Sequence, residues 1–369
     1  MFKPSTWPSG GLKRQLADAG LALLLTGPAA LGLAALSGSG HRWVDLLAHF
    51  TAPAMSPALA GLVLATVFRL RLAGLSAGLA TALLAAALWG QIAPARTAPS
   101  TDGARLTVYV ANLHYQNTDV DRTAASIAAA APDIVVLVEV GPTMGQALDT
   151  LLPEHRYRAP STPGGPDNLV ASRWPLEALP AGGDGLSARG ARVETALGPV
   201  TVFATHLTRP WPFEYQWGQI TQVMALEARM AKVPGPVIAA GDFNSVTTAR
   251  IGRQIQSLGL KPAPAWPGTW PAAAPPPVRI AIDHLWAYTL EFWSASPVET
   301  AAADQGLDMT AIHAAWQRTV AAGLAQATLH QPADDGYVPQ GKTGVHSEHL
   351  GYLLAEMQSL ARAHPHGQW

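Results

Sequence analysis

Three long apolar runs near the N-terminus place the strongest limit on what this chain can fold into. None of them contains a charged residue except at its margins, and they cover residues 19–36, 52–68 and 73–93. Each approaches the roughly 20 residues needed to cross the hydrocarbon core of a bilayer, and none shows the polar stripe of a soluble amphipathic helix. We therefore expect residues 1–96 to form a membrane anchor. Its predicted transmembrane helices cover residues 17–37, 50–69 and 73–93.

Basic residues predict the orientation of this anchor. Lys13 and Arg14 precede the first run, and Arg69 and Arg71 lie between the second and the third. Because Lys and Arg accumulate in cytoplasmic loops, both segments are expected on the cytoplasmic side. An odd number of spans then places the rest of the chain on the non-cytoplasmic side. A cleaved signal peptide is the alternative for the first run, and the two later runs would still anchor the chain.

The part of the chain after the anchor is acidic and contains no cysteine. Residues 101–369 hold 17 Lys or Arg and 23 Asp or Glu, and the whole chain has no Cys. The lack of cysteine excludes disulfides, thiolate catalysis and Cys-ligated zinc. A domain with net negative charge has no general attraction for a polyanion, so we expect no tight non-specific DNA binding.

Beyond a linker at residues 97–104, short apolar strands dominate the pattern. Runs rich in β-branched residues predict strands, with few helices between them, at residues 106–111, 133–140, 169–172, 191–195, 200–205, 237–240, 279–287 and 349–356. This pattern predicts an α+β domain over residues 105–369. Its fold would be two packed β-sheets flanked by helices, a four-layer α/β/β/α sandwich.

Polar residues recur where these apolar strands begin or end, and one of them, Asp283, interrupts a predicted strand. They are Asn112, Glu139, His206, Asp242, Asn244, Asp283, Glu348 and His349. A buried carboxylate or amide is costly unless it is paired or binds a metal. Any one of these residues has a simpler explanation, since an isolated Gly-Asp-x-Asn is often only a turn. The joint pattern predicts one shared site at one end of the sheet sandwich.

The motifs that carry these residues resemble a known superfamily. In chain order they read ANL, LVEV, NLVASRWPL, THL, GDFN, IDH and SEH. This order over residues 105–356 is similar to the endonuclease/exonuclease/phosphatase superfamily, whose members include deoxyribonucleases, neutral sphingomyelinases and inositol-phosphate phosphatases. The resemblance implies a metal-dependent phosphodiesterase or phosphatase. The anchored form resembles a bacterial subgroup, which implies a multi-pass protein of the inner membrane.

The resemblance also implies a role for each motif residue. His349 would be the central acid/base residue, and Asp283 would orient its imidazole ring. Asp242 would orient or deprotonate the attacking water, while Asn244 and His206 would hold phosphate oxygens.

A divalent metal completes the implied site. Mg²⁺ or Mn²⁺ prefers oxygen ligands and keeps several waters, so one or two carboxylates and an amide suffice. Glu139 is the first choice of ligand, assisted by Asn112 and Glu348. Glu348 stands where the family usually has Asp, which puts the metal geometry in question. Asp283 and the SEH motif are also unusually far apart, so residues 290–343 are interpreted as an insertion.

Aromatic clusters bear on the substrate. Trp211 and Trp217 follow the THL motif, and Trp266 and Trp270 precede the IDH motif. They either cap the core or contact the substrate or the bilayer, and Asn168 is a further weak candidate for substrate binding. Nucleic acid, lipid and small phosphodiester all stay open, and an acidic domain tethered to a bilayer slightly favours the last two. The alternative function is a catalytically reduced protein that binds a phosphorylated ligand in the same cleft.

Overall fold

The computed structural model describes residues 9–93, 106–161, 167–182, 184–210 and 216–287. All of them lie in one compact unit that spans Met1–Leu290. The predicted strand at 349–356 and the predicted insertion at 290–343 lie outside the described residues.

The N-terminal part is helical, as the apolar runs predict. Among the described residues, three helices are long and apolar enough to cross a membrane. Small residues let them pack closely: a Cβ at Gly32 would overlap Leu83, and one at Gly61 would overlap Leu25. Leu24, by contrast, is 75% exposed on the outside of the bundle. The helical elements are α1 (Ser9–Leu36), α2 (Arg42–Leu47), η1 (Ala48–Phe50), α3 (Thr51–Val67) and α4 (Arg71–Ile92).

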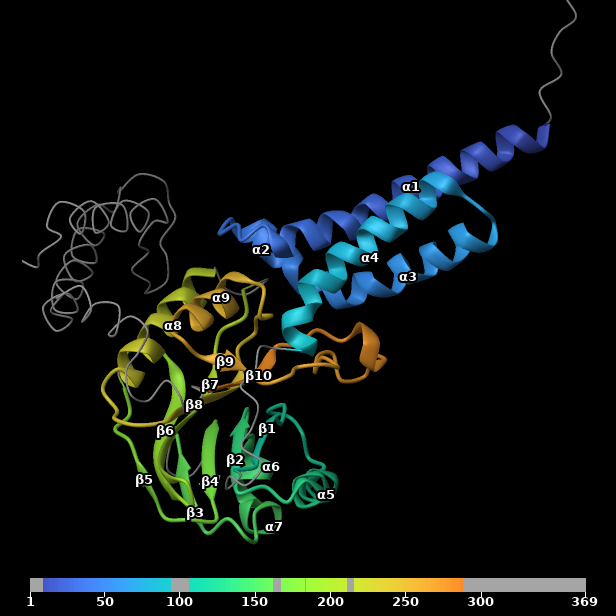
Figure 1. Cartoon of the computed structure of the whole chain (residues 1–369). Helices are drawn as coiled ribbons and strands as arrows, with labels where there is room; N and C mark the ends of the chain where they lie inside the picture. Colours follow the sequence, from blue (N-terminus) through green and yellow to red (C-terminus); the bar gives the residue numbers. More distant parts are fainter. Residues whose placement is uncertain (1–8, 94–105, 162–166, 183, 211–215, 288–369) are drawn as a thin grey trace, which may run out of the picture. The chain divides into compact units, whose positions relative to one another are not determined.

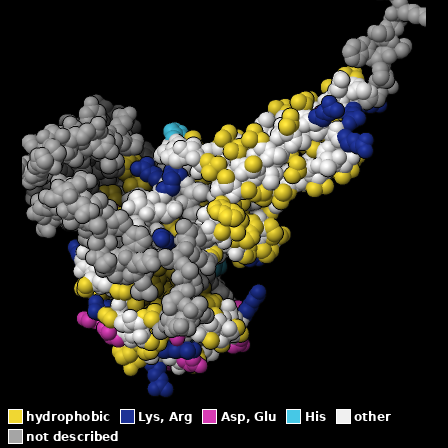
Figure 2. Space-filling view, in the orientation of Figure 1, with side chains coloured by type: hydrophobic (Ala, Val, Ile, Leu, Met, Phe, Trp, Pro, Cys, Tyr) yellow, Lys and Arg dark blue, Asp and Glu magenta, His cyan; other side chains and the backbone are white. Residues whose placement is uncertain are grey.

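Four of the five basic residues described in this part, Lys13, Arg14, Arg69 and Arg71, lie at one end of the helices, and Arg42 lies at the other end on α2. Arg14 donates a hydrogen bond from Nη2 to the carbonyl oxygen of Arg69, at 2.7 Å. Asp18 accepts one from the backbone N–H of Ala73, at 2.8 Å. Figure 2 shows Lys and Arg side chains gathered at this end, while hydrophobic side chains cover much of the remaining helical surface. The two basic segments that the positive-inside argument uses are therefore neighbours in space.

The rest of the described chain contains two mixed β-sheets (Figure 1). The four-stranded sheet has the order β1 (Val108–Asn112), β2 (Ile134–Val138), β4 (Asn168–Ser172) and β3 (Tyr157–Pro160). The six-stranded sheet has the order β5 (Leu176–Ala178), β6 (Ser187–Thr195), β7 (Gly198–His206), β8 (Val237–Asp242), β10 (Asp283–Ala287) and β9 (Lys261–Pro262). Two mixed sheets flanked by helices confirm the predicted fold class.

Strand β2 shows why the fold has layers. All five of its residues are buried, and successive side chains of a strand point to opposite faces. Val136 packs between the two sheets with Val170 and Val202. Val135 faces the other way, into a core shared with Ile127 of a covering helix. An apolar residue at every position of β2 therefore requires a sheet covered on both faces.

Helices cover the outer faces of the sheets. Those near the four-stranded sheet are α5 (Val120–Ala130), α6 (Pro142–Gln146) and α7 (Leu148–Leu151). Those near the six-stranded sheet are α8 (Gln216–Met230) and α9 (Arg250–Ser257), and a short η2 (Pro276–Val278) precedes β10. One boundary differs from expectation. The predicted strand at 279–287 begins only at Asp283, because Ile280 instead pairs with Trp270 in an isolated bridge.

Candidate active site

Strand register brings most of the predicted site residues to one end of the sandwich. In the six-stranded sheet, Asp242 pairs with His206 of β7 on one side and with Asp283 of β10 on the other. In the other sheet, Asn112 ends β1 beside the end of β2, and Glu139 directly follows β2. Both sheets therefore contribute side chains to the same place.

Asn112 connects the carboxylates of the two sheets. Its Nδ2 donates hydrogen bonds to Glu139 Oε1 at 2.8 Å and to Asp242 Oδ2 at 3.0 Å. Its Oδ1 accepts a hydrogen bond from the backbone N–H of His114 at 2.8 Å. In this arrangement the amide nitrogen, rather than the oxygen that a metal would need, faces the carboxylates. Asn112 thus holds Glu139 and Asp242 together.

Glu139, His206 and Asp242 form a candidate metal centre. One ligand atom from each lies within 4.8 Å of the other two, and His206 Nε2 is 3.5 Å from Glu139 Oε1. Beside them, Oδ1 of Asp283 is buried and has no hydrogen-bond partner in the described part of the chain. Carboxylate oxygens suit Mg²⁺ and Mn²⁺, and an imidazole nitrogen also suits transition metals. The donor set therefore fits a divalent cation.

The three carboxylates of the cluster differ in acidity. Burial opposes ionisation of Glu139, but the hydrogen bond from Asn112 and the charge of His206 hold its pKa below the usual value. Burial raises the pKa of Asp242 to about 6, and the charge of Glu139 adds to the rise. Burial and the charge of Asp242 raise the pKa of Asp283 to about 7. Near neutral pH the cluster therefore contains groups that exchange protons, as catalytic sites often do.

Two residues of the site have a left-handed backbone conformation. Glu139 has φ 53° and Asn244 has φ 47°, a region that costs a side chain-bearing residue on the order of 1 kcal/mol or more. Two hydrogen bonds compensate at Asn244. Its N–H donates to Asp242 Oδ1 at 2.7 Å, and its Nδ2 donates to the carbonyl oxygen of Leu207 at 2.8 Å. The GDFN segment is thus a turn that fixes the Asp242 carboxylate.

Three further residues, Asn168, Trp217 and His284, contact residues outside the cluster. Asn168 is fully buried at the start of β4, opposite Val138, and its Nδ2 donates to Ser187 Oγ at 2.9 Å. Trp217 lies on α8, with the Arg250 guanidinium 6.0 Å from its ring centroid.

His284, the last residue of the IDH motif, contacts the Ser245 carbonyl oxygen through Nε2 at 2.8 Å. Burial lowers its pKa to about 4, so this imidazole is neutral.

Sequence reasoning missed Arg209 as a site residue. It follows His206 by three positions and is exposed, and its charge lowers the pKa of Asp242. A guanidinium group near the cluster suits phosphate oxygens, which it can contact with two N–H groups. The sequence feature that could have identified Arg209 is its position as a basic residue in the loop after the THL motif. Three predicted site residues, Trp211, Glu348 and His349, lie outside the described residues.

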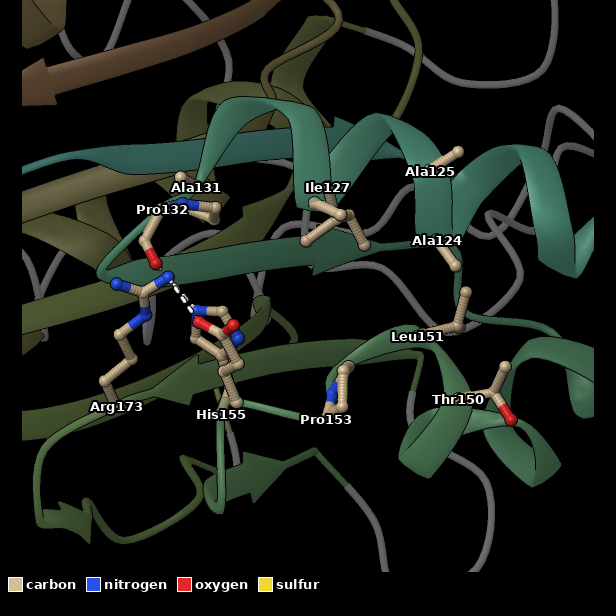
Figure 3. Close-up of a pocket in the computed structure, with 12 residues that line it drawn as sticks. Ala124, Ala125, Ile127, Ala131, Pro132, Thr150, Leu151, Pro153, His155 and Arg173 are labelled. Carbon is tan, nitrogen blue, oxygen red and sulfur yellow. Dashed lines mark hydrogen bonds and ion pairs between the residues drawn. The ribbon is translucent and has the colours of Figure 1, made fainter.

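A cavity of about 330 Å³ lies at the other end of the four-stranded sheet (Figure 3). It is lined mainly by apolar residues of α5 and α7, together with His155 and Arg173. His155 Nε2 is 3.0 Å from the Pro132 carbonyl oxygen, and Arg173 forms an ion pair with Glu154. Pro132 precedes β2 whereas Glu139 follows it, so this cavity is separate from the carboxylate cluster.

Solved structures that resemble this chain share low sequence identity with it. TDP2 from D. rerio, complexed with a single-strand DNA product, is 17% identical with a TM-score of 0.42, covering 52% of this chain and 86% of that one. An endonuclease/exonuclease/phosphatase from Bacteroides vulgatus is 17% identical with a TM-score of 0.41, covering 50% and 87%. A double mutant of beta toxin from Staphylococcus aureus, with bound magnesium ions, is 14% identical with a TM-score of 0.40, covering 50% and 84%.

The C-terminal part of the chain matches a different family. A model described as phenylacetic acid catabolic protein matches residues 277–369. A 1,2-phenylacetyl-CoA epoxidase subunit from Escherichia coli strain K12 is 33% identical over 148 residues, which cover 40% of this chain. The chain spans 58% of the length of that curated relative. Glu348 and His349 therefore lie in a segment that matches this second family.

The strand-end cluster lies in a segment with its own family match. The model of the endonuclease/exonuclease/phosphatase family matches residues 110–305, which is just over half of the chain. This range contains Glu139, His206, Asp242 and Asp283, and it begins two residues before Asn112. The chain belongs to the endonuclease/exonuclease/phosphatase family.

Proposed function

We propose that this protein is a membrane-anchored, divalent-metal-dependent hydrolase of phosphoesters. The observation that carries the proposal is the meeting of Glu139, His206 and Asp242, whose ligand atoms lie within 4.8 Å of one another. These residues come from both β-sheets, and their two carboxylates suit a hard cation. Nuclease and phosphodiesterase activities are both compatible with such a site.

The chain's own residues would divide the chemistry among them. Glu139 and Asp242, with His206, would hold Mg²⁺ or Mn²⁺. Such an ion supplies charge neutralisation at the phosphate and makes a bound water more acidic. Asp242 would also orient the attacking water beside that ion. Arg209 would add positive charge beside the phosphate oxygens.

The acid/base role of His349 belongs to the same proposal. The SEH motif supports it, with Asp283 as the group that orients the imidazole and Glu348 as a further ligand. Asn244 would contribute to phosphate binding beside Asp242. The phenylacetic acid catabolic protein match over residues 277–369 competes with this assignment.

The anchor supports a cellular location for this activity. The three apolar helices and the clustered basic residues at one end support a multi-pass protein of a bacterial inner membrane. The catalytic domain would then face the non-cytoplasmic side. We propose the lipid bilayer and a phosphoester substrate as its partners, without tight non-specific binding to DNA.

The proposal is tested with the full chain in lipid nanodiscs. Hydrolysis of a soluble aryl phosphodiester, of single- and double-stranded DNA and of phospholipid is measured with Mg²⁺, with Mn²⁺ and with a chelator. We expect turnover of at least one substrate that depends on the metal and is abolished by Asp242→Asn. If none of the substrates is hydrolysed with either metal, or if Asp242→Asn hydrolyses them as fast as the wild type, the proposed enzymatic function is wrong.

The second family match favours one other candidate, a binding protein. If residues 277–369 do not supply an acid/base residue, the cluster would bind a phosphorylated ligand without cleaving it. Inorganic phosphate and an aryl phosphomonoester, titrated in the presence of Mn²⁺, distinguish the two functions. Saturable binding that Asp242→Asn weakens, with no turnover, would support the binding protein.

A further inference from the structure

Residues 263–278, called here the tryptophan loop, form an exposed segment without a charged residue. Trp270 is 52% exposed and Trp266 is 36% exposed, and most of the neighbouring Pro and Ala residues are exposed as well. A stretch of 16 residues on the surface of a soluble domain ordinarily contains charges. An exposed apolar surface of this kind is typical of a site that contacts another protein or a membrane.

The tryptophan loop is attached to the end of a predicted membrane span. The backbone N–H of Ala265 donates a hydrogen bond at 2.9 Å to the carbonyl oxygen of Gln91, which lies one residue before the end of α4. The η2 segment of the loop also packs beside α3. Trp89 on α4 is 65% exposed at the same end of the helix. Tryptophan is enriched at this level of membrane proteins because its ring suits the headgroup layer.

The same loop reaches the candidate active site. Thr269 Oγ1 accepts a hydrogen bond from the backbone N–H of Asp283 at 3.4 Å. Trp270 exchanges backbone hydrogen bonds with Ile280, at 3.0 and 2.6 Å. Gly268 packs so closely that a Cβ there would overlap the carbonyl oxygen of Arg279. One tightly packed loop therefore connects the end of α4 with the backbone of Asp283, a residue of the cluster.

A second contact fixes the catalytic part against the anchor. Asp45 of α2 accepts a hydrogen bond from the backbone N–H of Arg250 at 2.5 Å and lies 3.6 Å from Arg253 Nη2. Arg253 Nη2 also donates to the carbonyl oxygen of Ser39 at 3.1 Å. Apolar residues close the joint, since Ala48 and Ala87 share a core with Ile282. Contacts at α9 and at the tryptophan loop therefore join the part that holds the site to the helices of the anchor.

We propose that the tryptophan loop is a membrane-docking surface that lies in the headgroup layer of the bilayer holding the anchor. The site beside it would then draw its substrate from that layer, as the phosphodiester headgroup of a membrane phospholipid. The docking surface stands by itself, whereas the substrate class rests on the proposed hydrolase function.

The absence of cysteine from this chain makes the docking surface directly measurable. Single variants Trp270→Cys and Ala272→Cys are labelled with an environment-sensitive fluorophore in nanodiscs that contain nitroxide-labelled lipid. The matched control is Leu197→Cys, because Leu197 is 39% exposed in the turn before β7, at the strand end opposite His206. We expect blue-shifted, lipid-quenched emission at both loop positions and neither effect at position 197. Equal emission and quenching at all three positions would overturn the docking surface.

Kinetics test the substrate class. Headgroup release from phosphatidylethanolamine, phosphatidylglycerol and sphingomyelin in nanodiscs is compared with hydrolysis of a soluble aryl phosphodiester. We expect Trp266→Ala/Trp270→Ala to lower lipid turnover by at least about tenfold, equivalent to ~1.4 kcal/mol, and to leave the soluble ester unchanged. Wild-type turnover of the soluble ester but of none of the lipids would overturn the lipid substrate alone. Turnover of neither would defeat the hydrolase proposal, while the fluorescence result would still decide the docking surface.

Discussion

At the scale of single residues, the site gathers carboxylates at the cost of stability. Glu139, Asp242 and Asp283 share one end of the sandwich, and burial together with mutual repulsion raises the pKa of both aspartates. Such an arrangement has no structural benefit in the absence of a cation or a proton. It is what a metal-dependent site requires, because the bound ion offsets the repulsion that the folded protein otherwise carries.

Replacing Asp283 tests this trade between stability and function. Because its pKa is raised to about 7 in the folded state, Asp283 favours folding at low pH, and this contribution is lost as the pH rises through about 7. Asp283→Asn should therefore raise the unfolding midpoint of chelator-treated protein at pH 8 by about 2–4 °C or more, the shift given by ~1 kcal/mol in a domain of this size. Hydrolysis should fall in the same variant.

A surface aspartate provides the matched control for that measurement. Hydrogen bonding to Arg229 is the largest cause of the lowered pKa of Asp184. A lowered pKa contributes stability above the unfolded value, so Asp184→Asn should lower the midpoint at pH 8 and lose this effect in acid. If the two variants shift the midpoint in the same direction, the charge account of the cluster is wrong.

His349 is the residue on which the two family matches disagree. If it supplies the acid or base, His349→Ala should lower the maximal rate by about 10²–10⁴-fold and remove one limb of the pH profile. His206→Ala is the comparison, because His206 lies in the described cluster. An unchanged rate in His349→Ala would show that His349 is not the acid/base residue.

At the scale of elements, one glycine lets β8 pass close to β7 beside the site. Gly241 has φ 132°, and a Cβ there would overlap the carbonyl oxygen of Thr205. Gly241→Ala should therefore displace Asp242, destabilise the domain by about 1–3 kcal/mol and abolish hydrolysis. Thermal unfolding and turnover measure the two effects.

Gly198 separates backbone strain from loss of the site. It also has a positive φ, of 96°, but a Cβ there would meet nothing within 4 Å, and it lies at the end of β7 opposite His206. Gly198→Ala should reduce stability while the rate per folded molecule stays the same. A parallel loss of rate in both alanine variants would contradict the local role of Gly241.

Sequence predicted the elements whose pattern is decided locally. Strand β2 is apolar at every position, and Asp242 ends a buried strand at a turn motif, so both can be recognised without the fold. Strands β3, β5 and β9 have two to four residues, too few for a periodic signal. Their pairing depends on neighbours distant in sequence. The same holds for Asp45, which in the sequence is an ordinary span-margin residue and gains its role only through contact with α9.

At the scale of the whole molecule, orientation in the membrane decides which compartment the site serves. We predict that a single cysteine at position 197 reacts with a membrane-impermeant maleimide in intact cells. A cysteine at position 12, next to the basic Lys13 and Arg14, should react only after the membrane is permeabilised. The reverse pattern would place the site in the cytoplasm and contradict the orientation inferred from the basic residues.

Two family models match different parts of this chain, and each part contributes different residues to the proposed site. The endonuclease/exonuclease/phosphatase match contains the cluster from Asn112 to Asp283, and the second match begins only at residue 277. The candidate metal centre therefore consists of described residues within the first match, whereas the role of His349 depends on a segment that the second match covers.

Hydrolysis of a soluble aryl phosphodiester, measured against free Mn²⁺ concentration, tests the central claim most directly. Wild-type protein should show saturable activation by Mn²⁺ and no activity with a chelator. Glu139→Gln keeps the size of the side chain but removes its charge, so it should require at least about tenfold more Mn²⁺, reflecting loss of ~1.4 kcal/mol of binding, or show no activity at all. An activation curve that Glu139→Gln leaves unchanged would contradict a metal centre at this cluster.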